Sequence, residues 1–394
     1  MKLMKKTSLF AGITALAVLA AGCSTGSNST SSAPTDSGAS TNSSASNATG
    51  DSAKLTKVEY GLLPYQDWMP WVVAQELGYF KEAGLEMNFT KFTDDVAVAQ
   101  AIQSGDIDVG SGNSGTAPLI ASRFPEQTQF SINNSFAGFA IMVRPDDVYP
   151  KGKIKTYEQF LEEEKAKGSS EADAANAAIV DTTKQLEGKT IVMDRSTGSN
   201  IPLQAALKAA GLNENQVEFE DIADIEGALA FWKGTGDFEL GGYPQVTSLT
   251  KLGAIKLITA NELTSAVVLS GEIAKSSWVE QNMDTVQKMR QVWYKVIDDI
   301  KTKPDVLAKL TEVVNEWQGT SLTVDEMEAL MKVNYWPSKN EVNDYFFADN
   351  AKMNAHNVFT ASLDYWVNVK KQVESGTVDV DKFVTAKQIF DQEQ

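Results

Sequence analysis

The chain has 394 residues, of which 52 are acidic and 35 basic, so its formal net charge at neutral pH is −17. This acidic balance argues against nucleic acid as a partner and against adsorption to an anionic lipid surface. A single cysteine excludes an intramolecular disulfide and a cysteine-based zinc site. The only histidine, His356, stands among Asn and Ala, so the sequence offers no Ser–His pair and no metal–histidine site. We therefore expect neither a metal nor a cofactor.

The first 22 residues are typical of an export signal. Lysines at positions 2, 5 and 6 precede an apolar stretch over residues 9–19, which is too short to span a bilayer. Small residues then lead to Cys23 in the run LAAGC, which resembles a bacterial lipobox. We predict that residues 1–22 are a lipoprotein signal peptide and that Cys23 is lipidated, with an ordinary signal peptide as the alternative. The mature protein is then held by lipid at the extracytoplasmic face of the bacterial cell membrane.

The next segment, residues 23–53, consists almost entirely of Ser, Thr, Asn, Gly and Ala. Such a composition buries too little apolar surface to fold, so we predict a disordered tether. The roughly 340 residues that remain exceed what a single hydrophobic core usually organises, which indicates two domains.

After the tether, short apolar strands alternate with helices, which favours a largely parallel α/β sheet. The pattern predicts strands over residues 57–63, 86–92, 107–109, 128–134 and 139–143. It predicts helices over residues 71–77 and 96–103, and another that begins near Thr116. The run that starts at Arg144 and Pro145 marks the exit from a first lobe.

A charged, alanine-rich stretch over residues 151–187 follows, and it predicts a solvated helical insertion or, alternatively, a contact surface for a partner. A second lobe then has predicted strands over residues 190–193, 217–221 and 238–241 and helices over residues 202–210 and 225–233. A strand over residues 265–269 returns the chain to the first lobe. Helices over residues 283–300 and 355–373 complete that lobe.

Two stretches, residues 101–118 and 228–249, share one pattern: helix, glycine, acidic strand, glycine-containing loop, helix. This repetition indicates two similar lobes that face each other. The triplet Gly110, Gly112 and Gly115 also matches the GxGxxG dinucleotide fingerprint. The acidic residue that should end a second strand is missing, because Glu126 lies in a proline-containing segment. We therefore interpret these glycines as lining a loop.

Polar and aromatic side chains gather where α/β proteins bind ligands, beyond strand carboxyl ends and at helix N-termini. The loop after the first strand, which is flanked by two prolines, supplies Tyr65, Gln66, Asp67 and Trp68. Small-residue loops before helices supply Asn113, Ser114 and Thr116 in the first lobe and Ser196, Thr197, Ser199 and Asn200 in the second. The corresponding later loop of the second lobe supplies Tyr243. We predict that these residues contact a ligand, with plain helix capping as the alternative for the small polar ones.

The stretches KVEYGLL, AQELGYFKEAGLEMNF and AIQSGDIDVGSGNSGTAPLI resemble the solute-binding proteins of ABC importers. The resemblance is to the branch that serves nitrate, aliphatic sulfonates, taurine and thiamine-pyrimidine precursors. It covers roughly residues 57–258, and the insertion over residues 151–187 departs from it. It implies a two-lobed α/β fold of the periplasmic-binding-protein type (type II), with a ligand cleft between the lobes. Lobe I would comprise residues 54–145 and 260–394, and lobe II residues 146–259.

On this resemblance the protein captures a small polar solute and delivers it to the transmembrane permease of an ABC importer, as a monomer that closes on its ligand by hinge motion. Two other classes stay open: an extracellular enzyme, and a sensor that signals through a membrane receptor. The carboxylate pairs Asp106/Asp108 and Asp221/Asp224 could in principle serve acid–base chemistry. Structural or capping roles fit these pairs better, so we expect no enzymatic activity.

Two features point in opposite directions on the charge of the solute. The helix N-termini near Thr116 and Ser199 favour an anionic group. Asp67 lies between Tyr65 and Trp68 in the sequence, and a carboxylate near aromatic rings favours an ammonium group. Together they predict an amine-bearing or zwitterionic solute such as an aminosulfonate, and a plain anion or a pyrimidine precursor remains an alternative.

Overall fold

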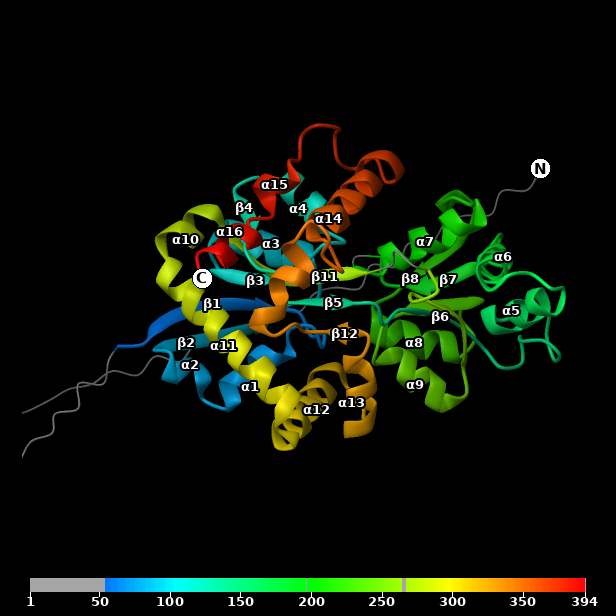
Figure 1. Cartoon of the computed structure of the whole chain (residues 1–394), viewed down its shortest axis with the longest axis horizontal. Helices are drawn as coiled ribbons and strands as arrows, with labels where there is room; N and C mark the ends of the chain where they lie inside the picture. The colour runs from blue at the N-terminus through cyan, green and yellow to red at the C-terminus, as the bar shows by residue number, and fades with distance from the viewer. Residues whose placement is uncertain (1–53, 196, 264–266, 394) are drawn as a thin grey trace, which may run out of the picture. The chain divides into compact units, whose positions relative to one another are not determined.

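The computed structural model describes residues 54–195, 197–263 and 267–393, which belong to one compact unit. The predicted signal peptide, Cys23 and the tether lie outside these ranges. Within them the strands form two sheets, each covered by helices (Figure 1). No helix in the described ranges combines the length and apolar character needed to cross a bilayer.

The first sheet has the strand order β12-β5-β11-β3-β1-β2, and β4 pairs with β11 beside β5. Its strands are β1 (Thr56–Leu62), β2 (Leu85–Lys91), β3 (Val109–Asn113), β4 (Gln127–Gln129), β5 (Asn134–Phe136), β11 (Val268–Lys275) and β12 (Asn334–Tyr335). The helices that alternate with its early strands are α1 (Met69–Glu76), α2 (Tyr79–Glu82), α3 (Asp95–Ser104) and α4 (Ala117–Arg123). Helix α3 illustrates why these elements form, since the Asp94 side chain accepts from the amide of Ala97 at 2.8 Å at its start and Gly105 ends it at a positive φ of 85°.

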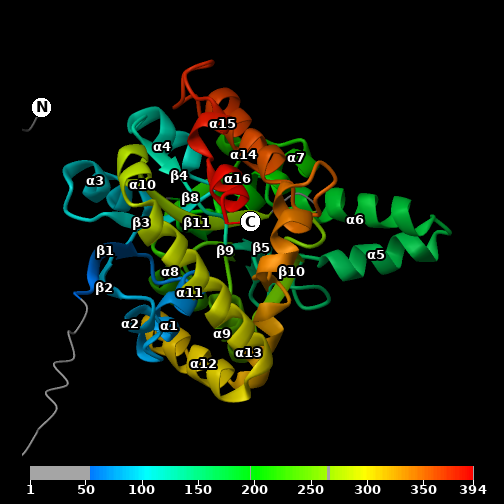
Figure 2. The same cartoon turned by 60° about the vertical axis from the view of Figure 1, so that its left-hand side comes forward.

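The second sheet has the order β10-β6-β9-β7-β8. Its strands are β6 (Ala140–Val143), β7 (Thr190–Met193), β8 (Glu218–Asp221), β9 (Phe238–Gly241) and β10 (Ile255–Thr259). Its helices are α7 (Asn200–Ala210), α8 (Asp224–Trp232) and α9 (Gln245–Leu252). The predicted helical insertion forms the hairpin of α5 (Tyr157–Ala166) and α6 (Glu171–Lys184), which projects from this part of the molecule (Figure 2). Helix α5 buries none of its residues, whereas α6 packs through Ala174, Ala178, Thr182 and Thr183.

The C-terminal third is helical and returns to the first sheet, as predicted. Its helices are α10 (Ser276–Gln281), α11 (Met283–Thr302), α12 (Pro304–Gln318), α13 (Val324–Met331), α14 (Ala355–Asp364), α15 (Val380–Phe383) and α16 (Ala386–Asp391). Helix α11 packs on α1, where the rings of Trp71 and Trp293 lie 4.7 Å apart and both side chains are buried. This contact anchors the helix that follows the predicted ligand loop to the main core of the first sheet.

Several sequence predictions about the strands need correction. Both sheets are mixed, because β11 runs antiparallel to β3 and β6 runs antiparallel to β9. Strand β6 belongs to the second sheet, although the predicted boundary at residue 145 assigned it to the first lobe. The predicted strand over residues 128–134 is two short strands, β4 and β5, and the predicted helix over residues 355–373 ends with a π-helical turn at Tyr365–Val369.

The glycine-rich stretch predicted as a loop is largely strand β3. A Cβ atom added to Gly110 would lie 2.2 Å from Cγ1 of Val98, and one added to Gly112 would lie 2.6 Å from Cγ2 of Ile273. These two glycines therefore allow α3 and β11 to approach β3 closely. The fingerprint match is explained by packing, which agrees with the rejection of a nucleotide site.

Candidate ligand-binding site

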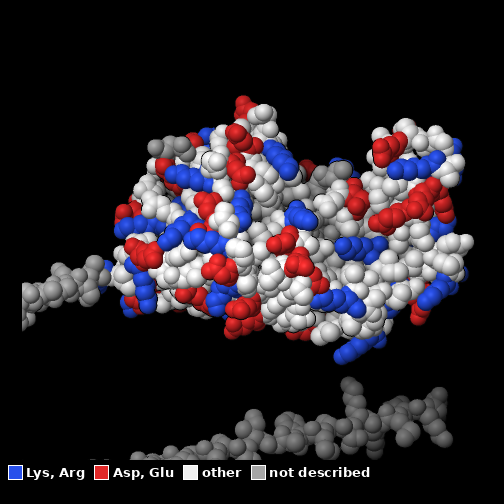
Figure 3. All heavy atoms as spheres, turned by 60° about the horizontal axis from the view of Figure 1, so that its bottom comes forward, with Lys and Arg blue, Asp and Glu red and all other residues white. Residues whose placement is uncertain are grey.

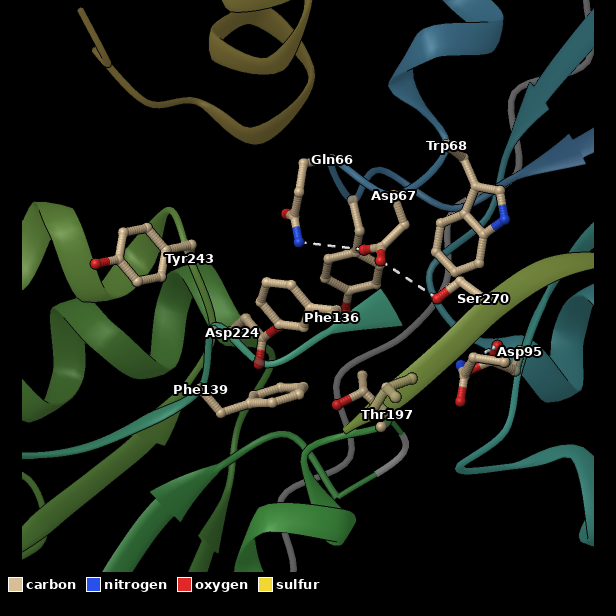
Figure 4. Close-up of a pocket in the computed structure, with 15 residues that line it drawn as sticks. Gln66, Asp67, Trp68, Asp95, Phe136, Phe139, Thr197, Asp224, Tyr243 and Ser270 are labelled. Atoms are coloured by element: carbon tan, nitrogen blue, oxygen red, sulfur yellow. Dashed lines mark hydrogen bonds between the residues drawn. The ribbon is translucent and has the colours of Figure 1, made fainter. Parts of the chain in front are cut away.

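A cavity of about 50 Å³ lies where loops of the two sheets meet (Figure 4). Because a water molecule needs about 10–15 Å³ of such space, the cavity has room for a few non-hydrogen atoms. Residues from both sheets line it: Tyr65, Gln66, Asp67, Trp68, Asp95, Asn113, Phe136, Phe139, Thr197, Gly198, Asp224, Gly242, Tyr243, Val268 and Ser270.

The loop between β1 and α1 is fixed by two indole hydrogen bonds. The Trp68 Nε1–H donates to the carbonyl of Gly271 at 3.0 Å, and the Trp336 Nε1–H donates to the carbonyl of Asp67 at 3.3 Å. Both tryptophans are buried, so these bonds are shielded from water. The loop therefore presents its side chains to the cavity from a defined backbone position.

The carboxylate of Asp67 is buried and accepts three side-chain hydrogen bonds. Its donors are Asn134 Nδ2 at 2.5 Å, Gln66 Nε2 at 3.1 Å and Ser270 Oγ at 3.3 Å. Burial raises the pKa of Asp67 to about 6, and the bonds from Asn134 and Ser270 hold it from rising further. Asp67 is thus a preorganised acceptor on one wall of the cavity.

A second carboxylate, Asp95, lies in the first turn of α3. It accepts from Asn113 Nδ2 at 2.7 Å, while Asn113 Oδ1 accepts from the amide of Gly115 at 2.8 Å. Burial raises the pKa of Asp95 to about 8, and the charges of Asp94 and Asp194 add to this. In water the side chain of an aspartate is ionised at neutral pH, whereas burial makes the ionised form of Asp95 less favourable. A positively charged group beside Asp95 would make the ionised form favourable again.

The third carboxylate, Asp224, begins α8 on the side of the second sheet. Burial raises its pKa to about 7, with the Asp194 charge as the next cause, although a hydrogen bond from Tyr65 lowers it in part. Behind it on β9, burial and the Asp224 charge raise the pKa of Glu239 well above its usual range. The two sheets therefore present carboxylates toward the same small space.

Apolar and aromatic groups complete the walls. The rings of Phe136 and Phe139 pack edge to face with centroids 4.7 Å apart, and Tyr65 and Trp68 lie 6.5 Å apart. Figure 4 shows Phe136 and Phe139 between Tyr243 on one side and Thr197 on the other. Rings beside carboxylates suit a solute that combines positive charge with a hydrocarbon part.

Basic side chains occur beside the site but are engaged elsewhere. Arg195 donates from Nη2 to Glu214 at 2.7 Å, and its guanidinium lies 4.3 Å from the ring centroid of Phe219. Lys256 Nζ donates to the Tyr243 hydroxyl at 3.2 Å, and this hydroxyl points away from Asp67 and Asp224 (Figure 4). On the face shown in Figure 3, by contrast, acidic and basic side chains are interspersed. The cavity thus differs from this face in having acidic but no basic side chains among its described lining residues.

The structure brings together seven of the predicted ligand residues. Those that line the cavity are Tyr65, Gln66, Asp67, Trp68, Asn113, Thr197 and Tyr243. Four others do not line it: Ser114, Thr116, Ser199 and Asn200. The predicted Ser196 lies outside the described residues, as does Cys23.

Local hydrogen bonds explain why most of these four side chains face elsewhere. Ser114 Oγ accepts from the amide of Leu269 at 3.0 Å and so fastens β11 to the end of β3. Ser199 Oγ donates to the carbonyl of Asp194 at 2.5 Å, and Asn200 Nδ2 donates to the carbonyl of Arg195 at 2.8 Å. Neither side chain caps α7, so the capping alternative does not hold for them; Ser199 and Asn200 instead close their own loop.

Sequence reasoning missed the other lining residues. Asp95 and Asp224 had a visible signal, because each is an acid at the start of a predicted helix near a strand end, but the same pattern is typical of capping. Phe136, Phe139, Val268 and Ser270 had none, since they reach the cavity only through the pairing of β11 with β5 and the passage of the chain into β6.

Two mixed α/β sheets whose loops enclose a small polar and aromatic cavity are the architecture of a ligand-binding protein with a periplasmic-binding-protein fold. A family model described as the NMT1-like family matches residues 51–315. The chain belongs to this family.

Solved structures with the same fold agree with this assignment. The aliphatic sulphonate-binding protein SsuA of Escherichia coli is 15% identical, with a TM-score of 0.60 over 85% of this chain and 99% of its own. The alkanesulfonate-binding protein SsuA of Xanthomonas axonopodis pv. citri, bound to MOPS, is 13% identical, with a TM-score of 0.59 over 84% and 99%. The nitrate-binding protein NrtA of Synechocystis PCC 6803 is 11% identical, with a TM-score of 0.51 over 86% and 99%. A search of curated proteins found no match. The predicted periplasmic-binding-protein fold is thus confirmed.

Proposed function

We propose that this protein is the extracytoplasmic solute-binding component of an ABC importer. The observation that carries the proposal is the cavity whose lining comes from both sheets, because a solute held there touches both lobes at once. The family and the similar structures, which are named as sulfonate- and nitrate-binding proteins, support binding rather than catalysis. Delivery to a permease, a lipid anchor at Cys23 and a monomeric state belong to the same proposal.

The solute in this proposal is small, polar and organic, and it bears a positive nitrogen. Asp67, Asp95 and Asp224 support the positive charge, and the rings of Trp68 and Phe136 support an organic part. We propose as ligand contacts the seven predicted residues that line the cavity. The lobes close by hinge motion around it, and their boundary falls before β6, close to residue 139.

A thermal-shift screen tests the proposal, because a solute that binds the folded state raises the melting temperature by mass action. The screen covers sulfonates, aminosulfonates, nitrate, pyrimidines and organic amines. Equilibrium dialysis then measures saturation, and mass spectrometry of the recovered solute shows whether it is chemically unchanged. Turnover of the solute would instead favour the enzyme alternative.

A variant that fills the cavity shows whether a solute raises the melting temperature by binding in the cavity or by an effect elsewhere on the protein. Thr197→Phe places a ring in the space that Thr197 lines, and Thr377→Phe makes the same change at an exposed position. We expect Thr197→Phe to abolish the thermal shift and Thr377→Phe to retain it. An equal shift in both variants would place the bound solute outside the cavity and overturn the proposal.

A further inference from the structure

We infer that the solute is a small organic cation that carries no sulfonate, carboxylate or phosphate group. This inference rests on the proposed function and narrows it, because the predicted aminosulfonate has an acidic group and no Lys, Arg or His stands among the described residues that line the cavity. Its basis is the arrangement of charged, aromatic and polar side chains around the cavity that residues of both sheets line.

The first step concerns charge. Among the described lining residues, Asp67, Asp95 and Asp224 are acidic, and none is Lys, Arg or His. Asp194 lies near enough to influence both Asp95 and Asp224 electrostatically. An anionic group in this space would lose its hydration without a charge-assisted partner and would meet several like charges. A cation would instead stabilise the ionised form of these carboxyl groups.

The second step concerns the N-terminus of α7, one of the two that had favoured an anion in the sequence. At the start of α7, Thr197 Oγ1 and Ser199 Oγ both donate to the carbonyl of Asp194, at 3.1 and 2.5 Å. Asn200 Nδ2 donates to the carbonyl of Thr197 at 3.0 Å. These hydroxyl and amide hydrogens are committed to the loop itself. They are therefore not aimed at a sulfonate in the cavity.

The third step separates an organic cation from a metal ion. No three Asp, Glu, His or Cys side chains in the described ranges converge closely enough to hold a metal. The carboxylates instead come from separate elements, with the rings of Phe136 and Trp68 also on the walls. Spaced carboxylates beside aromatic faces match N–H donors that are separated by a short hydrocarbon.

The test compares solutes with equal numbers of non-hydrogen atoms and different charge: 1,3-diaminopropane, 1,3-propanediol, propanoate and methanesulfonate. Equilibrium dialysis at pH 8 and constant ionic strength gives their affinities. We expect 1,3-diaminopropane to bind at least roughly tenfold more tightly than each of the others, as for a desolvated charge-assisted contact. Tighter binding of propanediol, propanoate or methanesulfonate, or no binding of the diamine, would overturn the inference.

A matched pair of variants assigns the effect to the cavity. Asp224→Asn removes one lining carboxylate, and Glu226→Gln removes an exposed charge from the same helix. We expect diamine affinity to fall at least roughly tenfold in Asp224→Asn and less than about twofold in Glu226→Gln. An equal fall in diamine affinity in both variants would show that only the net charge of the protein matters, and it would refute the inference. Unfolding curves of both variants show that they fold.

The proposed solute-binding function and the cation inference would be overturned by different results. If a sulfonate or nitrate from the thermal-shift screen occupies the cavity, the solute-binding function stands and the cation inference falls. If the cavity-filling Thr197→Phe leaves all solute binding unchanged, the proposed function falls as well.

Discussion

Replacing Asp224 by Asn should make the ligand-free protein more stable at alkaline pH. In the folded state burial and Asp194 raise the pKa of Asp224 to about 7 from an ordinary value of 3.8. A carboxyl whose pKa is raised by folding contributes stability that is fully present below its unfolded pKa of 3.8, is lost progressively as the pH rises, and is gone above about 7. The Asn side chain has a similar shape and no charge, so it avoids this loss.

The magnitude follows from the size of the pKa shift. A shift of roughly three units corresponds to at most about 4 kcal/mol at pH values well above 7. Asp224 is partly exposed, so solvent screening reduces the expected gain to about 1–2 kcal/mol. The first turn of α8 opposes this, because a helix N-terminus favours a negative charge by about 0.3–1 kcal/mol. We expect a net gain, because the contribution of burial and of repulsion by Asp194 exceeds this opposing one.

Urea unfolding followed by tryptophan fluorescence at pH 5 and pH 8 measures the effect. Neighbouring groups also affect the ionisation of Asp224. The charges of Asp194 and Glu226 raise its pKa and a hydrogen bond from Tyr65 lowers it, while the charge of Asp224 in turn raises the pKa of Glu239. We expect wild type and Asp224→Asn to differ less at pH 5 than at pH 8, where the variant should unfold at clearly higher urea. Glu226→Gln, the exposed control, should stay within about 0.5 kcal/mol of wild type. An Asp224→Asn protein that is less stable than wild type at both pH values would refute the electrostatic reasoning.

Three further predictions concern anchoring, closure and the other wall of the cavity. Cys23→Ser should release or misprocess the full-length protein in cells, as fractionation shows, while the purified domain keeps its affinity; a lost affinity would contradict this. Small-angle scattering should give a smaller radius of gyration with saturating solute than without it, and an unchanged radius would leave lobe closure unsupported. Asp67→Asn should weaken diamine binding at least roughly tenfold and lower the melting temperature, because an amide would face the donors of Asn134 and Ser270; unchanged diamine affinity would remove Asp67 from the site.

Local patterns in the sequence predicted most helices and strands because apolar periodicity and capping residues act over a few positions. The helix predicted over residues 96–103 is α3, which Asp94 caps and Gly105 ends. The errors arose where distant segments decide the outcome. Gly110 and Gly112 read as a loop, but pairing with β11 makes them part of a strand. Likewise β6 joined the second sheet because β9 and β10 pair with it there.

The candidate site was likewise predictable from the sequence only where a local pattern marks it. The loop at Asp67 and Trp68 was predictable, because the carboxyl end of a first strand is a general binding position in α/β folds. Asp224 was assigned a structural role, since an acid at a helix start needs no ligand to explain it. Its position on the cavity depends on how α8 packs against the neighbouring strands, and no local pattern encodes that. Phe136 and Ser270 depend on the pairing of β5 with β11, which are separated by more than 130 residues.

The most direct test of the account is a crystal structure of the protein with the tightest-binding solute from the thermal-shift screen. The account predicts a solute enclosed between the two sheets, in contact with both Trp68 and Tyr243. Its positive nitrogen should lie within hydrogen-bonding distance of at least one of the carboxylates of Asp67, Asp95 and Asp224. A solute bound outside this cavity, or one that directs an acidic group toward these carboxylates, would contradict it.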